Sequence, residues 1–193
     1  MIAAGLLLLG YLSGSIPFGL IVVRLTRGVD VRERGSGNIG ATNVARVAGK
    51  GLGALVLVLD ALKGALPVLL AQRVAGAPEL PAGVGLAAFA GHVAPPWLGF
   101  RGGKGVATAL GVVAVLAPPA ALAGALTYAV VLAVFRISSV GSLLAGIVAV
   151  AVAWLVPGTP ALAAALTSVL FGAMLWTHRG NIGRLLRRGE PRV

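Results

Sequence analysis

The chain has 193 residues, of which 58% are hydrophobic and only 11% are charged, and its mean hydropathy is +0.98. Soluble globular domains carry about a quarter charged residues, so this composition excludes an ordinary soluble domain and predicts a membrane protein. The formal net charge is +11, and the lack of cysteine excludes disulfides, thiolate metal sites and a cysteine nucleophile.

Apolar runs alternate with clusters of Arg and Lys along the chain. The runs cover residues 2–23, 52–72, 80–100, 106–135, 140–156 and 161–176. A membrane-spanning helix needs about 20 apolar residues, with roughly 17 to 25 as the range, and most of these runs reach that length. The first run has no positively charged n-region and continues through Tyr11 and Pro17, so we interpret it as a retained span rather than a signal peptide.

The run 106–135 decides the predicted topology. One helix over this run would be about 45 Å long, against a hydrocarbon core of about 30 Å. Pro118 and Pro119 lie near its middle and would break such a helix, so we predict two short helices that meet there. All basic clusters then lie on one side, which the positive-inside rule makes cytoplasmic. We therefore predict an all-α polytopic membrane protein with seven transmembrane helices, the N-terminus outside and the C-terminus cytoplasmic, as a single membrane-embedded domain over residues 1–193.

Polar side chains gather in the predicted cytoplasmic segments. These segments are GSGNIGATNVAR at 35–46, GHVAPPWLGFRGGKGVAT at 91–108, FRISSVGS at 135–142 and THRGNIGRLL at 177–186. The first matches the glycine pattern of dinucleotide-binding folds, but a span and a charged loop precede it instead of a strand, so we reject that interpretation. The second is not a Walker A loop, because Leu98 replaces its first glycine and Gly105 follows Lys104.

Convergent hydrogen-bond donors with few carboxylates describe a site for anions. Glycines let the backbone approach an anion and direct N–H groups at it, and a helix N-terminus adds positive potential. The chain contains only five Asp and Glu residues. We therefore predict a site for two phosphates and, without a carboxylate cluster, no bound metal. The basic residues lie between spans, which argues against a nucleic-acid partner.

Other polar residues have simpler explanations. Asp60 and Lys63 lie three apart inside the second run and are expected to pair, either as a scaffold for the active site or as a purely structural pair. His92 is expected to form an interhelical hydrogen bond. Gly10 and Gly14 are expected to permit close packing between helices.

The motifs resemble those of a known family. SGNIGATNVAR, GHVAPPWLGFRGGKGVAT and HRGNIGRLL are similar to the three signature motifs of the bacterial acyl-phosphate-dependent glycerol-3-phosphate acyltransferases, the PlsY family; DALKG at 60–64 and GSIPFG at 14–19 are also similar to family segments. The resemblance covers essentially the whole chain. Val93 and Arg101 depart from the pattern, where an aromatic residue and often a lysine are expected, and neither departure removes chemistry.

The resemblance implies an activity and a location. It implies a multi-pass enzyme of the bacterial cytoplasmic (inner) membrane, with its active site facing the cytoplasm. The implied reaction is the first step of phospholipid synthesis, in which acyl phosphate and glycerol 3-phosphate give lysophosphatidate and inorganic phosphate. Membrane lipid surrounds such an enzyme, and no cofactor or nucleic acid is implied. An acyl phosphate carries a good leaving group, so no acyl-enzyme is needed, in agreement with the lack of Cys and of a Ser–His–Asp pattern.

The resemblance also implies site residues. Those expected to hold glycerol 3-phosphate are Ser36, Arg46, Lys104, His178 and Asn181. Those expected to cradle the acyl phosphate are Gly37, Asn38, Gly40, Thr42, Asn43, Gly102, Gly103 and Ser142. The expected catalytic residues are His178, Lys104, Ser36 and Asn181, and the general base is either His178 or a phosphate oxygen of a substrate.

The alternative function is a transporter or channel for organic phosphates. Basic donors at one membrane face could select anions, as in some transporters. Transporters, however, often contain inverted repeats that place the site near the midplane. Here the polar motifs lie on one predicted face, which favours the enzyme.

Overall fold

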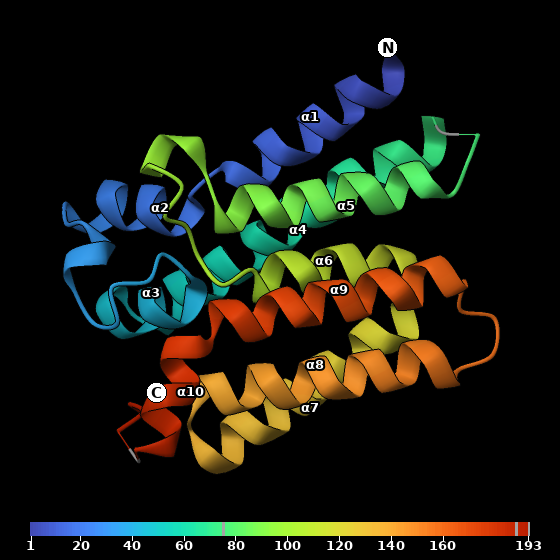
Figure 1. Ribbon diagram of the computed structural model, residues 1–193. Coiled ribbons are helices and arrows are strands. Elements are labelled where there is room, and N and C mark those ends of the chain that lie inside the picture. The colour runs from blue at the N-terminus through green and yellow to red at the C-terminus, as the bar shows by residue number, and fades with distance from the viewer. Residues whose placement is uncertain (75, 188, 193) are drawn as a thin grey trace.

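The computed structural model describes residues 1–74, 76–187 and 189–192, and within these ranges every regular element is a helix (Figure 1). The elements in chain order are α1 (Ile2–Ser15), α2 (Phe18–Arg27), the 3-10 helix η1 (Val31–Glu33), α3 (Ala41–Ala48), α4 (Lys50–Val74), α5 (Glu79–Val93), the 3-10 helix η2 (Pro96–Leu98), α6 (Val106–Leu116), α7 (Pro118–Phe135), α8 (Ser138–Leu155), α9 (Ala161–Thr177) and α10 (Arg179–Leu186).

The long helices run between two ends of the molecule and pack in pairs. α1 packs on α5, α4 on α6, and α7 on α8 (Figure 1). The α1–α5 crossing is close because α1 presents glycine there: a Cβ at Gly14 would lie 1.9 Å from the carbonyl oxygen of Ala88, and one at Gly10 would lie 2.7 Å from that of Val84. The predicted close packing at these glycines is confirmed.

Several helices are suited to cross a membrane. Four stretches are long and apolar enough, namely Ile2–Arg27 (α1 with α2), α4, α7 and α8. The pair α9 and α10 gives a fifth if it is counted as one span, although the two helices are bent by 59°. α5 and α6 have 15 and 11 residues, fewer than the roughly 20 that a complete span needs. The fold is thus that of an integral membrane protein, and its span count depends on the short helices.

Proline decides where the apolar runs break. The run 106–135 divides at Ala117, between α6 and α7, and the predicted split at Pro118 is confirmed. The run 2–23 was expected to be one helix, but it breaks at Ile16, which is extended (φ −64°, ψ 116°) because Pro17 follows it. In the run 80–100, α5 ends at Val93, shortly before Pro95 and Pro96, and the predicted cytoplasmic segment 91–108 continues from its last turn.

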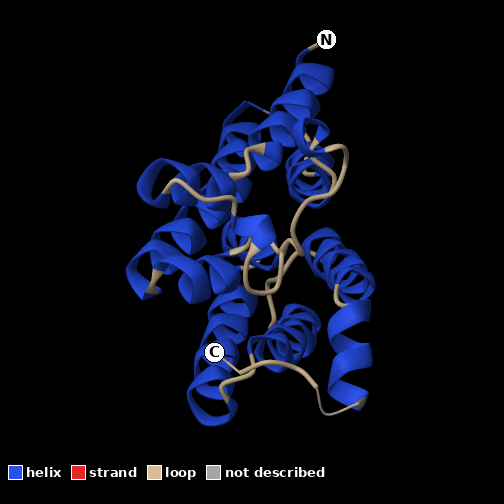
Figure 2. Cartoon of the chain, turned by 90° about the vertical axis from the view of Figure 1, so that its left-hand side faces the viewer, coloured by secondary structure: helices blue, strands red, loops and turns tan. Residues whose placement is uncertain are grey.

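Two short helices lie inside the polar motifs. α3 forms the second half of the 35–46 segment, which was expected to be a loop, and α10 forms most of the 177–186 segment. Both lie at the end of the molecule that also holds α2 and the C-terminus (Figure 1). Figure 2 looks onto this end and shows loop segments in the middle with helices around them.

Candidate active site

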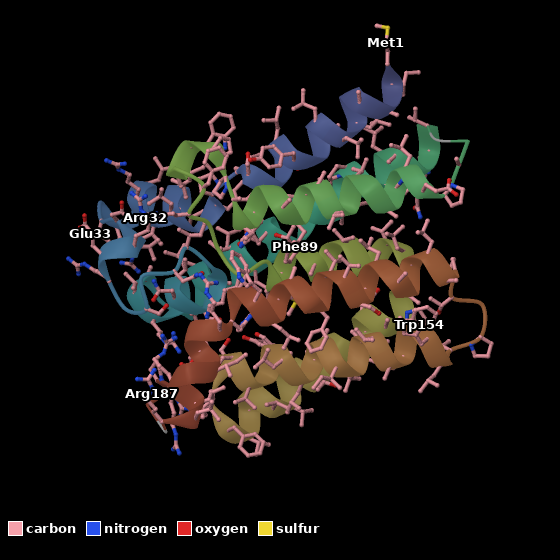
Figure 3. The ribbon with its side chains drawn as sticks, viewed as in Figure 1. Met1, Arg32, Glu33, Phe89, Trp154 and Arg187 are labelled. Carbon is pink, nitrogen blue, oxygen red and sulfur yellow. The ribbon has the colours of Figure 1, made fainter. Side chains whose placement is uncertain are left out.

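The predicted motifs meet at one end of the helix bundle. α3, the loop before α6, the start of α8 and the α9–α10 junction all lie there (Figure 1). Arg32 and Arg187 extend from this end, whereas Met1 and Trp154 lie toward the other (Figure 3). The structure therefore brings the four polar segments together, as the predicted topology requires.

Asn43 organises the first loop from within. Asn43 is only 1% exposed, and its Oδ1 accepts a hydrogen bond from the Ser36 N–H at 2.8 Å. Its Nδ2 donates to the carbonyl oxygens of Val31, Arg34 and Asn38 at 3.0, 3.1 and 2.8 Å. The side chain was expected to contact a substrate, but these bonds occupy both ends of the amide, so its role here is to shape the loop.

Some donors of this loop are bonded within the protein, and others are left for a ligand. The Gly40 N–H donates to Asn38 Oδ1 at 2.8 Å, and the Gly37 N–H donates to the Arg34 carbonyl at 3.1 Å. Gly37 has φ +72°, which a residue with a side chain rarely adopts. Ser36 is exposed, and no described residue bonds to its hydroxyl. The loop thus offers a hydroxyl to an anion rather than the glycine N–H groups that were expected.

The second loop presents Lys104 by closing onto α5. The N–H groups of Gly102 and Gly103 donate to the carbonyls of Val93 and His92 at 2.9 and 3.0 Å. A Cβ at Gly103 would lie 2.2 Å from His92 Nε2, so only glycine fits against this ring. These two glycines were expected to direct their N–H groups at a phosphate, but here they donate them to the end of α5.

His92 and Thr177 support the same loop. His92 was expected to form an interhelical hydrogen bond, but its Nδ1 is 3.9 Å from Asp60 Oδ1, beyond hydrogen-bonding distance, and its ring packs against Gly103 instead. Thr177, the last residue of α9, donates from Oγ1 to the Lys104 carbonyl at 3.1 Å. The backbone on both sides of the Lys104 side chain is therefore held in place.

Lys104 is a partly buried cation without an ion-pair partner among the described residues. Burial lowers the pKa of Lys104 to about 8. The guanidinium groups of Arg184 and Arg46 act in the same direction, whereas the Glu190 carboxylate raises this pKa. At neutral pH the ammonium is mostly protonated, so it can bind an anion.

His178 lies between α9 and α10 and is 1% exposed. Its Nδ1 lies 2.9 Å from the Met174 carbonyl oxygen, which can only accept, so Nδ1 carries the hydrogen and Nε2 carries the lone pair. Burial lowers the pKa of His178 to about 4, and the nearby Lys104 ammonium adds to this effect. His178 is therefore neutral and offers an acceptor.

Three hydroxyl groups link α3, α7 and α8. Ser138 Oγ lies 2.9 Å from Thr42 Oγ1 and 2.9 Å from Tyr128 Oη. Ser142 is buried and donates to the Ser138 carbonyl at 3.0 Å, one turn back on α8. Thr42 and Ser142, both predicted site residues, are thus brought to the same place from segments far apart in the sequence.

The end of the chain returns to this site. Asn181 Nδ2 and Ser139 Oγ donate to Glu190 Oε1, and Arg184 Nε donates to Glu190 Oε2 at 2.8 Å. Arg46 Nη2 donates to the Pro191 carbonyl at 3.3 Å. The sequence interpretation missed Glu190, Thr177 and Tyr128; a single acid in a basic tail was the available signal for Glu190.

The arrangement suits two anions and acyl transfer. It combines cationic side chains, hydroxyl groups and a neutral imidazole, and such preorganised groups stabilise charge that develops at a carbonyl or a departing phosphate. Within the described ranges, no three His, Asp or Glu side chains cluster as a metal site would need. The fold is that of an integral membrane protein, with a candidate anion-binding site at one end.

Comparison with known proteins identifies the family. Residues 4–188 match the family model for glycerol-3-phosphate acyltransferase. A glycerol-3-phosphate acyltransferase of Myxococcus xanthus is 61% identical, with 98% of each chain covered. One from Anaeromyxobacter dehalogenans is 54% identical, covering all of this chain and 98% of the relative.

The fold is also similar to solved structures. Crystal structures of PlsY, an integral membrane glycerol 3-phosphate acyltransferase, superpose with TM-scores of 0.94 for a glycerol 3-phosphate form and 0.92 for a lysophosphatidic acid form. Both are 41% identical to this chain and cover all of it, and the chain covers 96% and 95% of theirs. The chain belongs to the glycerol-3-phosphate acyltransferase family, and it is an acyltransferase of phospholipid synthesis.

Proposed function

We propose that this protein transfers an acyl group from acyl phosphate to the 1-hydroxyl of glycerol 3-phosphate, giving lysophosphatidate and inorganic phosphate as the first step of phospholipid synthesis. The single observation that carries this proposal is the Lys104 ammonium, which has no ion-pair partner among the described residues and lies near Arg46 and a neutral His178, in a family named for glycerol 3-phosphate. Both substrates carry phosphate, which accounts for a site rich in cations and hydroxyl groups.

We infer the topology from the same chemistry. The single domain 1–193 would cross the bacterial inner membrane seven times, through α1, α4, α5, α6, α7, α8 and α9. The basic end that holds the site would face the cytoplasm by the positive-inside rule, with the N-terminus outside. This orientation would give soluble glycerol 3-phosphate access from the cytoplasm, while the acyl chain of the second substrate stays in the bilayer.

The residue roles follow from which groups are available. Lys104, Arg46 and Ser36 would bind the phosphate of glycerol 3-phosphate, and Asn181 would contact the same substrate. Thr42 and Ser142 would lie beside the acyl phosphate. The shape of the surrounding loops would come from the glycines and amides already described, namely Gly37, Asn38, Gly40, Asn43, Gly102 and Gly103.

We propose that a phosphate oxygen of the acyl donor takes the proton of the attacking hydroxyl. A general base works best with a pKa near the working pH, and His178, at about 4, is poorly matched. A phosphate with a second pKa of about 6 is better matched. His178 Nε2 would instead accept a hydrogen bond from the hydroxyl and orient it.

Replacing His178 with alanine is expected to raise KM for glycerol 3-phosphate about tenfold while lowering kcat less than about a hundredfold, because an orienting hydrogen bond is lost but the base remains. Initial rates with each substrate varied would separate the two constants. His178→Gln keeps an acceptor that cannot serve as a base and should retain more activity than His178→Ala. A fall in kcat of about 10²–10⁴ in both variants, with KM unchanged, would identify His178 as the base.

The function is tested with purified protein in detergent. Radiolabelled glycerol 3-phosphate is supplied with palmitoyl phosphate or, in parallel, with palmitoyl-CoA. Labelled lysophosphatidate from palmitoyl phosphate alone is the expected result. Product from palmitoyl-CoA alone would overturn the donor, and no product from either by folded protein would overturn the proposed reaction.

A further inference from the structure

Glu190 places a carboxylate inside a cationic site. It is the only acidic residue after Glu79 in the sequence, and its side chain is only 5% exposed although it lies three residues before Val193. Burial raises the pKa of Glu190, but hydrogen bonds from Asn181, Ser139 and Arg184 outweigh burial and lower it overall. Glu190 is therefore ionised at neutral pH.

The bonds to Glu190 come from two helices that border the site. Ser139 lies in the first turn of α8 and donates to Oε1 at 2.7 Å, while Asn181 of α10 donates to the same oxygen. Arg184, also of α10, donates to Oε2 at 2.8 Å. The next residue, Pro191, accepts from Arg46 of α3. The tail thus connects three elements, and each of them carries a predicted substrate contact.

The carboxylate also determines how the Asn181 amide is oriented. An asparagine amide has donors at Nδ2 and an acceptor at Oδ1, whereas an ionised carboxylate can only accept. Glu190 therefore engages the Nδ2 end and leaves Oδ1 as an acceptor. Hydroxyl groups of a substrate can donate to that oxygen.

We propose that Glu190 is a positioning residue for acyl transfer, which holds the Asn181 amide so that Oδ1 accepts a hydrogen bond from a hydroxyl of glycerol 3-phosphate. This inference rests on the proposed function. Glu190 acts through Asn181 and through the link between α8 and α10, without touching the substrate itself.

A carboxylate in an anion site could instead compete with phosphate. The contacts favour positioning, because Asn181 is the only predicted glycerol 3-phosphate ligand that hydrogen bonds to Glu190 within the described ranges. Lys104 makes no ion pair with Glu190, so its ammonium stays available to the substrate. Competition predicts the opposite change in KM, which makes the two mechanisms separable.

The charge of Glu190 supplies a second observable. The charged groups that act on Lys104 are Arg46 from α3, Arg184 from α10 and Glu190 from the tail, and the neutral His178 at the α9–α10 junction lies near it. Glu190 is the anion of this set and raises the pKa of Lys104. Removing its charge lowers that pKa, so Lys104 loses its proton at lower pH.

The test compares full-length variants in the acyl phosphate assay. Glu190→Gln is expected to raise KM for glycerol 3-phosphate about tenfold, with a smaller change in kcat, because a charged hydrogen-bond acceptor is lost. The alkaline decline of kcat/KM should move to lower pH. Glu33→Gln removes one negative charge from an exposed position at the same end of the molecule and should change neither quantity.

A double-mutant cycle then tests whether Glu190 acts through Asn181. Glu190→Gln combined with Asn181→Ala should be little worse than Asn181→Ala alone, because coupled residues are not additive. Should Glu190→Gln fail to fold, Glu190→Asp serves in its place. This variant keeps the charge, so the alkaline decline of kcat/KM should stay at the wild-type pH. Its shorter side chain should still raise KM for glycerol 3-phosphate.

Each contrary result has a definite meaning. A lower KM in Glu190→Gln would overturn positioning and establish competition with phosphate, and additive effects in the double variant would remove Asn181 as the intermediary. If the wild type is active and Glu190→Gln has the same KM and the same pH profile, this inference alone is overturned. A wild type that forms no product would overturn the proposed function and this inference with it.

Discussion

Replacing Lys104 with methionine is expected to lower kcat/KM for glycerol 3-phosphate by about 10²–10³, the cost of removing one preorganised group that stabilises charge in a transition state. Methionine keeps the length of the side chain but not its ammonium. Because Thr177, Gly102 and Gly103 hold the surrounding backbone, the loop should keep its shape and the loss should be one of charge.

Lys50→Met provides the matched control. Lys50 is exposed at the start of α4, so its replacement removes the same charge without altering the site. Thermal unfolding, monitored by size-exclusion chromatography of heated samples, would show whether both variants remain folded. If Lys104→Met and Lys50→Met retain equal activity, Lys104 does not bind the substrate.

The role of the Lys104 charge also predicts how kcat/KM changes with pH. With the pKa of Lys104 at about 8 in the free protein, the protonated form dominates below that pH and is lost above it. Since kcat/KM reports on the free enzyme, it should decline as the pH rises through about 8. Lys104→Arg stays charged throughout this range and should be without that decline, whatever its absolute rate.

Replacing Lys63 with methionine is expected to destabilise the protein by about 3–5 kcal/mol, the usual cost of removing one partner from a buried ion pair. Lys63 Nζ lies 2.7 Å from Asp60 Oδ1, and the two side chains are only 2% and 3% exposed. The ammonium also donates to the Ile16 carbonyl at 2.7 Å and lies 5.7 Å from the centre of the Phe18 ring. It therefore stabilises the break between α1 and α2.

A double variant separates the effect of an uncompensated buried charge from the effect of losing the Lys63 side chain. Asp60→Leu with Lys63→Met leaves no uncompensated charge, so it should unfold at a higher temperature than Lys63→Met alone. Recovery should be incomplete, because the Ile16 carbonyl still lacks its donor. KM values close to those of the wild type in the folded double variant would assign the pair a structural role. A Lys63→Met protein as stable as the wild type would contradict this account.

Much of the fold could be predicted because it depends on composition along the chain. Hydropathy indicated the apolar helices, and Pro118 indicated the division between α6 and α7. The same reasoning failed at Pro17, where a long apolar run concealed a break. Hydropathy reports whether a segment is apolar, whereas proline geometry decides whether it stays helical.

The candidate site could be predicted as a set of residues but not as a set of roles. The motifs named side chains whose segments do gather at one end of the bundle (Figure 1). They did not reveal that Asn43 is fully engaged within its loop, or that Gly103 is glycine because the His92 ring lies against it. Which donors remain available depends on contacts between distant segments, and a motif does not contain those contacts.

The sequence by itself determined that this is a helical membrane protein with its cations grouped at one end, because hydrophobic length and charge placement follow directly from composition. Only the tertiary structure decided which polar groups are used internally and which are left for an anion. Closing the loops satisfies the N–H groups of Gly102 and Gly103, leaves Lys104 without an ion-pair partner among the described residues, and brings Glu190 to Asn181. A buried polar group must find a partner, and that partner is chosen by folding in three dimensions.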